Sequence, residues 1–314
     1  MFVTTFLDEK NVRIVWQRGE NMQKEQSDLE LWRKVQLGNC IKAVMIFVGI
    51  ILMQFAAYLI CVPLYMGLQT AKGLPVSGTP DMIMKSMLDS ESGMVILISM
   101  ISAILNLIWC GVLYYKSDWR ERPFSYKKAF NAKNSFGIVG VGFGGCTVLT
   151  LCLSVIMLII PDAFASYMDI MQNIDYENGI LTILYVLVLG PVAEEVIFRG
   201  AINDRLQLAF PFWIANAIQA ALFGVYHMNI IQGLYAFVLG SILGLIIRVT
   251  GSIWSSIITH IIFNSTSYLL GIISGDTTEG AVGLLIVFIL GIGSFIFGFK
   301  HYLNTFAEES AIEK

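Results

Sequence analysis

The strongest constraint on this fold is a series of apolar runs that recur along most of the chain. A membrane-spanning helix needs about 20 predominantly apolar residues. Runs of this kind occur at 41–66, 93–115, 136–160, 179–199, 211–228, 230–247, 252–273 and 281–299. Only 14% of the 314 residues are charged, whereas a soluble domain has about 25%. The sequence therefore predicts an all-α protein, a polytopic transmembrane bundle of about eight helices.

Basic residues are distributed unevenly between the two ends of these runs. If the N-terminus is cytoplasmic, 18 of the 20 Lys and Arg residues lie on the inner side, and the outer loops hold only Lys72 and Lys85. Cytoplasmic loops of membrane proteins carry such an excess of positive charge. Together with an even number of spans, this predicts a multi-pass protein of the cell membrane with both termini in the cytoplasm.

The charge pattern also suggests how the chain is divided. Residues 1–40 are charged and precede any apolar run, which predicts a cytoplasmic N-terminal segment. Residues 41–135 would hold the first two transmembrane helices and their loops, 136–300 a core with polar motifs, and 301–314 a cytoplasmic tail. There is no basic patch of the kind that binds nucleic acid. The expected partners are the lipid bilayer and a substrate.

The informative residues are the polar ones within apolar runs, because an ionisable group in a membrane span is costly and usually functional. The fourth run ends in the sequence EEVIFR, residues 194–199. Glu195 and Arg199 lie four positions apart on one helix face and are expected to pair. Glu194 points about 100° away from Glu195 and is left without that partner, so it is suited to exchange a proton with water.

Two of the three histidines also lie within apolar runs. His227 ends the sequence FGVYH, and His260 begins HIIFN, in which Asn264 lies one helical turn further on the same face. Glu194 and one histidine can activate water, while the other histidine and Asn264 donate hydrogen bonds to an oxyanion. Alternatively, His227, His260 and Glu194 can bind Zn²⁺, which would lower the pKa of a bound water. The residues leave open whether no cofactor or Zn²⁺ is required.

The depth of these groups in the membrane tests whether they can meet. If the fourth helix ended at Arg199, Glu194 would lie roughly 8 Å from the inner surface and His227 roughly 25 Å from it, at 1.5 Å per residue. If the helix continues to about Leu208, Glu194 lies roughly 21 Å, His227 roughly 24 Å and His260 roughly 18 Å deep. The levels then agree, so we expect the longer helix.

The three motifs resemble those of the CPBP family of intramembrane proteases, which includes type II CAAX prenyl proteases and the bacterial Abi immunity proteins. EEVIFR matches EExxxR, FGVYH matches FxxxH and HIIFN matches HxxxN, in the family's order. The resemblance covers about residues 180–270, within the segment 136–300. It implies that Glu194 and His227 activate water and that His260 and Asn264 stabilise the oxyanion. Glu195, Arg199 and Phe223 would be supporting residues.

Taken together, the sequence predicts an intramembrane endopeptidase that hydrolyses a peptide bond of a membrane-associated or peptide substrate. The alternatives are a non-catalytic membrane protein of the same family, such as a bacteriocin immunity factor, or a proton-coupled transporter that uses Glu194 as a relay. Transporters usually carry paired repeats with broken helices in both halves. Here a single Gly-Pro break, at Gly190 and Pro191, precedes a charged motif, which favours the enzyme.

Overall fold

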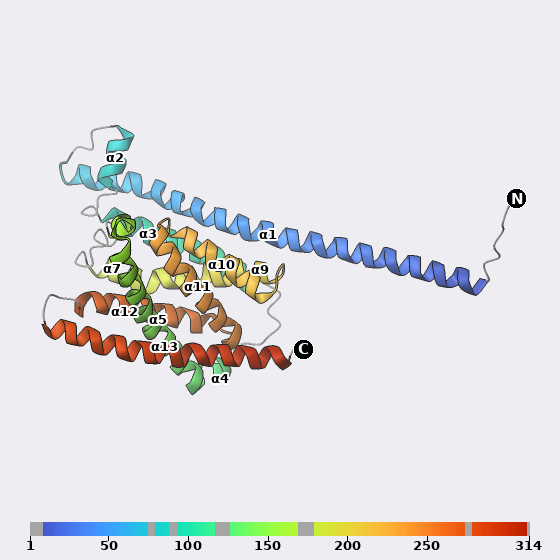
Figure 1. The fold of residues 1–314 in the computed structure, drawn as a ribbon. Helices are drawn as coiled ribbons and strands as arrows, with labels where there is room; N and C mark the ends of the chain where they lie inside the picture. The colour runs from blue at the N-terminus through green and yellow to red at the C-terminus, as the bar shows by residue number, and fades with distance from the viewer. Residues whose placement is uncertain are drawn as a thin grey trace.

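The computed structural model describes residues 9–74, 79–87, 93–116, 126–168, 179–273 and 278–312, and these fold into helices and connections without a strand (Figure 1). The predicted all-α transmembrane bundle is therefore confirmed. The helices before residue 179 are α1 (Glu9–Ala71), α2 (Pro80–Met87), α3 (Met94–Tyr115), α4 (Tyr126–Ala129), α5 (Ala132–Ile159) and the short η2 (Pro161–Phe164). After a composite helix at Ile180–Gln207 come α10 (Phe212–Tyr226), α11 (Ile230–Thr250), α12 (Ile253–Ile273) and α13 (Thr278–Ile312).

The number of full spans differs from the prediction. Seven helices in the described residues are long and apolar enough to cross a membrane. The eighth predicted span, 211–228, forms α10, which has only 15 residues. At 1.5 Å per residue α10 is about 22 Å long, less than the roughly 30 Å of a hydrocarbon core. The apolar run was read as a full span because its composition does not reveal that Pro211 and the end at Tyr226 bound a shorter helix.

Two terminal helices extend well beyond the apolar runs that predicted them. α1 is continuous from Glu9 to Ala71, so the boundary proposed at residue 40 falls inside it. α13 continues to Ile312, past the expected end at 299. As a result, His301 lies within the helix and its Nε2 contacts Asn134 Oδ1 at 2.8 Å. The part of the helix outside the apolar run carries the charged residues of each terminus.

The composite helix, Ile180–Gln207, carries the EEVIFR motif. It comprises α7 (Ile180–Leu184), η4 (Tyr185–Leu189), α8 (Gly190–Glu194), η5 (Glu195–Ile202) and α9 (Asn203–Gln207), of which η4 and η5 are π-helical. The helix continues past the end of the apolar run at 199, so the longer helix expected from the depth argument is confirmed. Short π-helical stretches within α-helices occur frequently at functional sites, and here they flank α8 on both sides.

The bundle packs in three groups around this helix. α1 and α3 contact one flank of it, while α5 and α13 pack against each other on the far side, with α10, α11 and α12 between (Figure 1). The α5–α13 contact is close because α5 carries glycine where the helices meet. A Cβ added at Gly140 would lie 2.6 Å from the Ser294 carbonyl oxygen of α13. Small residues at such contacts allow helix backbones to approach closely in membranes.

Figure 1 also shows that α1 begins and α13 ends at the same end of the bundle. This follows because α10, although short, reverses the chain direction between the composite helix and α11. The same-end arrangement agrees with the excess of Lys and Arg on one side in the sequence.

We therefore predict that tags fused to either terminus lie in the cytoplasm. In intact cells, both tags should resist added protease and should become sensitive after the membrane is permeabilised. A tag inserted after Met168, between η2 and the composite helix, serves as the opposite control and should be cleaved in intact cells. Cleavage of either terminal tag from outside would contradict this topology.

Candidate active site

A fully buried ion pair lies at the centre of the candidate site. Arg199 Nη1 lies 3.1 Å from Glu195 Oε1, and both side chains are completely buried. The pair expected from the spacing of four residues is therefore present. A buried charge is tolerated in such surroundings only when it is paired and hydrogen-bonded. The Glu195 carboxylate therefore needs hydrogen-bond donors in addition to Arg199.

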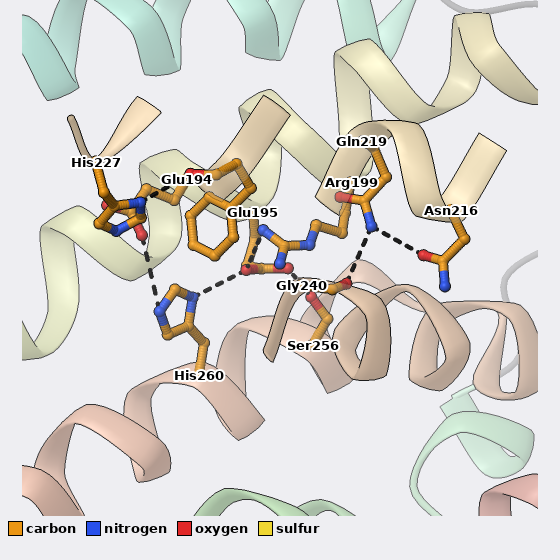
Figure 2. Close-up of polar contacts among 10 residues, drawn as sticks. Glu194, Glu195, Arg199, Asn216, Gln219, His227, Gly240, Ser256 and His260 are labelled. Carbon is orange, nitrogen blue, oxygen red and sulfur yellow. Dashed lines mark hydrogen bonds and ion pairs between the residues drawn. The ribbon is translucent and has the colours of Figure 1, made fainter. Parts of the chain in front are cut away.

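Two side chains of α12 donate hydrogen bonds to the Glu195 carboxylate. His260 Nδ1 lies 2.9 Å from Glu195 Oε1, and Ser256 Oγ donates a hydrogen bond to Glu195 Oε2 (Figure 2). Since a carboxylate only accepts hydrogen bonds, His260 must donate from Nδ1. Glu195 thus ties the composite helix to α12 and fixes the ring orientation of His260.

Phe223 of the FGVYH motif packs against the charged centre. Its ring lies 4.3 Å from Arg199 Cζ, in cation–π geometry, and is perpendicular to the His227 ring at a centroid distance of 4.8 Å. Across from them, a Cβ added at Gly240 of α11 would lie 3.1 Å from both Arg199 Nη2 and the Phe223 ring. Phe223 therefore contacts both Arg199 and His227.

Glu194 lies on a different face of the helix and faces open space. Its side chain is 19% exposed, and Glu194 Oε2 lies 3.7 Å from His260 Nε2. That separation is longer than a direct hydrogen bond. The two neighbouring carboxylates thus differ in environment, because Glu195 is enclosed by partners and Glu194 is accessible.

His227 follows the last residue of α10 as its C-cap, and its contact with the main chain determines its tautomer. Its Nδ1 lies 2.8 Å from the Phe223 carbonyl oxygen, in the preceding helical turn. Because a carbonyl only accepts, Nδ1 carries the proton, and the Nε2 of the neutral ring is left with a lone pair. His227 can therefore accept a proton or a hydrogen bond at Nε2.

A cavity of about 280 Å³ joins these groups, and Glu194, His227, His260 and Asn264 all line it. The structure thus brings the four predicted catalytic residues, from three separate helices, to one space. Tyr185 and Tyr226 line the same cavity. Tyr185 lies outside the three motifs and Tyr226 occupies an unspecified position of FxxxH, and their aromatic character alone does not distinguish them from core residues in the sequence.

Asn264 is attached to the composite helix by its side chain. Its Nδ2 donates a 2.9 Å hydrogen bond to the Val186 carbonyl oxygen. One of the two amide hydrogens expected to serve an oxyanion is therefore occupied by main chain. The second hydrogen and Oδ1 remain for the cavity that Asn264 lines.

The predicted zinc ligands do not gather into a metal site. Among the described residues, no three His, Cys, Asp or Glu side chains are arranged so that they could hold a metal ion. Zn²⁺ binds its ligands at about 2.0–2.3 Å in a tetrahedron, which places any two ligand atoms about 3.3–3.8 Å apart. The 3.7 Å between Glu194 Oε2 and His260 Nε2 is compatible with that separation. A pair separated in this way can enclose a water molecule as readily as an ion, but the third ligand is not assembled.

Ser256 is the contact that the sequence analysis missed. It lies four residues before His260, which lies four residues before Asn264, so the three share one face of α12. Each of them bonds to the composite helix. A polar residue at every fourth position of an apolar span was the available signal, and it was not recognised because serine is common in spans.

Comparisons with known proteins agree with this core. Residues 176–266 match the family described as type II CAAX prenyl endopeptidase Rce1-like. A Bacillus subtilis (strain 168) protein named "Putative membrane peptidase YdiL" is 29% identical over 85 residues. That match covers 27% of this chain and 35% of the relative, so the chain spans about a third of the relative's length in it. No solved structure matches the chain. The resemblance to the CPBP family is confirmed for this segment of a multi-pass membrane protein.

We predict that Arg199→Ala destabilises the fold strongly. Removing the guanidinium leaves the Glu195 carboxylate buried without its arginine partner, which costs about 3–5 kcal/mol in comparable pairs. Arg205→Ala, on the same helix but only partly buried, is the control and should cost much less. Thermal unfolding in detergent measures both. Equal losses of thermal stability in the two variants would show that the buried Glu195–Arg199 pair stabilises the fold no more than a partly buried arginine does.

We also predict different effects for two adjacent serines of α12. Ser256→Ala removes a hydrogen bond to Glu195 and should lower both melting temperature and activity. Ser255→Ala is the matched control, because Ser255 is equally buried and its Oγ has no hydrogen-bond partner in the described structure. It should be neutral or slightly stabilising. If both variants behaved alike, the Ser256–Glu195 bond would have no role in the site.

Proposed function

We propose that the chain is an intramembrane endopeptidase that hydrolyses a peptide bond of a membrane-associated or peptide substrate. The observation that carries the proposal is the contrast between the two neighbouring carboxylates. Glu195 is enclosed by Arg199, His260 and Ser256, while Glu194 faces a cavity that both intramembrane histidines line. A free carboxylate beside an imidazole with an available lone pair is suited to activate water.

In the proposed reaction, a water molecule binds between Glu194 and His227 Nε2. Glu194 takes a proton from the water, and the hydroxide attacks the carbonyl carbon of the scissile peptide bond. The resulting tetrahedral intermediate carries its negative charge on the former carbonyl oxygen. When the C–N bond breaks, the protonated Glu194 returns the proton to the departing amine. The carboxylate is thereby regenerated, and the products are a new carboxyl end and a new amino end.

His260 and Asn264 are proposed to stabilise the intermediate. Asn264 has one amide hydrogen that is not used by Val186. His260 donates to Glu195 from Nδ1, so a hydrogen at Nε2 requires the imidazolium form, which would lie between two carboxylates. Fixed donors aimed at a developing oxyanion contribute about 3–4 kcal/mol each in well-studied hydrolases.

The resemblance supports this reading over the alternatives. A Rce1-like match covers the motifs, and the similar Bacillus protein is named as a membrane peptidase. A transporter would use Glu194 as a proton relay, and two histidines beside a carboxylate would suit that role as well. The similarity to membrane peptidases is therefore what favours the protease over a transporter. A non-catalytic immunity factor would tolerate loss of Glu194, so substitution there separates the candidates.

We predict that Glu194→Gln abolishes proteolysis while the protein still inserts and folds. The amide keeps the size of the side chain but cannot take a proton, and a general base contributes about 10²–10⁴-fold in rate. The peptides and membrane proteins of cells that carry the wild type and Glu194→Gln are compared by mass spectrometry. A substrate appears as an uncleaved precursor in the variant, with an unchanged melting temperature as the control.

The same material tests whether the residues act as one unit. Glu194→Ala should cost nearly as much as Glu194→Ala combined with His227→Ala, because losses within a catalytic unit do not multiply. Activity that survives in metal-free protein would support direct activation of water, and stoichiometric Zn²⁺ lost together with activity would overturn it. Wild-type function in both Glu194 variants would favour the immunity factor or another non-hydrolytic role.

A further inference from the structure

A side-chain hydrogen bond joins α12 to η4, the first π-helical segment of the composite helix. Asn264 Nδ2 donates to the Val186 carbonyl oxygen at 2.9 Å. Carbonyl groups in the interior of a helix are normally occupied by main-chain donors. The bond to Asn264 therefore raises the question of why the Val186 carbonyl is available.

The main-chain donors of Val186 can be counted. In an α-helix the donor would be the N–H of residue 190, four positions on, and in a π-helix that of residue 191, five positions on. The Gly190 N–H donates to the Tyr185 carbonyl instead, in the π-helical register. Residue 191 is proline and has no N–H. Neither main-chain donor is present, and the amide of Asn264 takes their place.

We propose that Pro191 is a positioning residue for Asn264 and acts through the Val186 carbonyl. Proline at 191 keeps that carbonyl free of main-chain donors, so that it can hold one amide hydrogen of Asn264. Val186, Gly190, Pro191 and Asn264 all line the cavity. The replacement of the missing main-chain donor by the Asn264 amide does not depend on what the protein does. Its consequence for cleavage rests on the proposed function.

The bond has a clear effect on a side chain of this kind. Asn has two rotatable bonds, and a free amide beside a polar cavity would exchange among rotamers and water contacts. With one N–H anchored, the second N–H and Oδ1 are held in fixed directions beside Glu194 and His260. Donors that are fixed before the reaction avoid the reorganisation that mobile ones require.

A double-mutant cycle tests, without any substrate, whether Asn264 replaces the main-chain donor that Pro191 lacks. Asn264→Ala should lower the melting temperature of the otherwise wild-type protein by about 2–4 °C, as expected for the loss of one hydrogen bond. Pro191→Ala returns an N–H that can bond to Val186. In the Pro191→Ala background, the loss from Asn264→Ala should therefore fall to less than half.

The control uses another proline within a helix. Pro63 lies inside α1 and does not line the cavity, so Pro63→Ala should leave the effect of Asn264→Ala unchanged. If Asn264→Ala lowers the melting temperature equally in the wild-type and Pro191→Ala backgrounds, Pro191 does not act through the Val186 carbonyl and the proposal is wrong. This outcome does not depend on whether the protein is a protease.

The positioning role is measured on the precursor that accumulates with Glu194→Gln. Pro191→Ala should slow its cleavage at saturating concentration by roughly 10–100-fold. The Pro191→Ala/Asn264→Ala double variant should cleave no more slowly than Asn264→Ala alone. If the two substitutions acted independently, their reductions in cleavage rate would multiply. Full-speed cleavage by Pro191→Ala would overturn the positioning role. Absence of any precursor would count against the proposed function. The double-mutant cycle on melting temperature would still show whether Pro191 acts on Asn264 through the Val186 carbonyl.

Discussion

The rest of the site depends on the buried Glu195 carboxylate. A charge in the interior of a membrane protein must be paired and have its remaining lone pairs occupied. Arg199 supplies the charge from the same helix, and His260 and Ser256 supply hydrogen bonds from α12. Because these partners come from two helices, satisfying one carboxylate also fixes the distance and rotation of the composite helix relative to α12. The position of Glu194, one residue earlier, follows from that placement.

His260 links the structural and the chemical parts of this arrangement. Its Nδ1 is committed to Glu195, and its Nε2 faces Glu194 at 3.7 Å. The ring therefore cannot rotate to serve one carboxylate without breaking its contact with the other. His227 is fixed differently, by the carbonyl of Phe223 in its own helix. Each imidazole thus has one nitrogen held by the protein and one left for the cavity, which suits the acid–base roles proposed for them.

The sequence predicted the site more completely than the details of the helices around it. The four cavity residues and the Glu195–Arg199 pair followed from charge in apolar runs and from helical spacing, and the length of the composite helix followed from matching depths. The shortness of α10 was missed because apolar composition does not specify where a helix stops. The Ser256 and Val186 contacts were also missed, since they depend on how α12 packs and on a π-helical register that residue periodicity does not reveal.

The same helix register explains where the cavity lies. The composite helix contributes only residues from Tyr185 to Glu194 to its lining, and none after Glu194. This helix runs toward the end of the bundle at which the chain termini lie (Figure 1), so the cavity extends from mid-depth toward the opposite end. The short α10 fits this arrangement, because its end at Tyr226 leaves His227 at the cavity wall. With both termini in the cytoplasm, as predicted, this end of the cavity would lie in the outer half of the membrane.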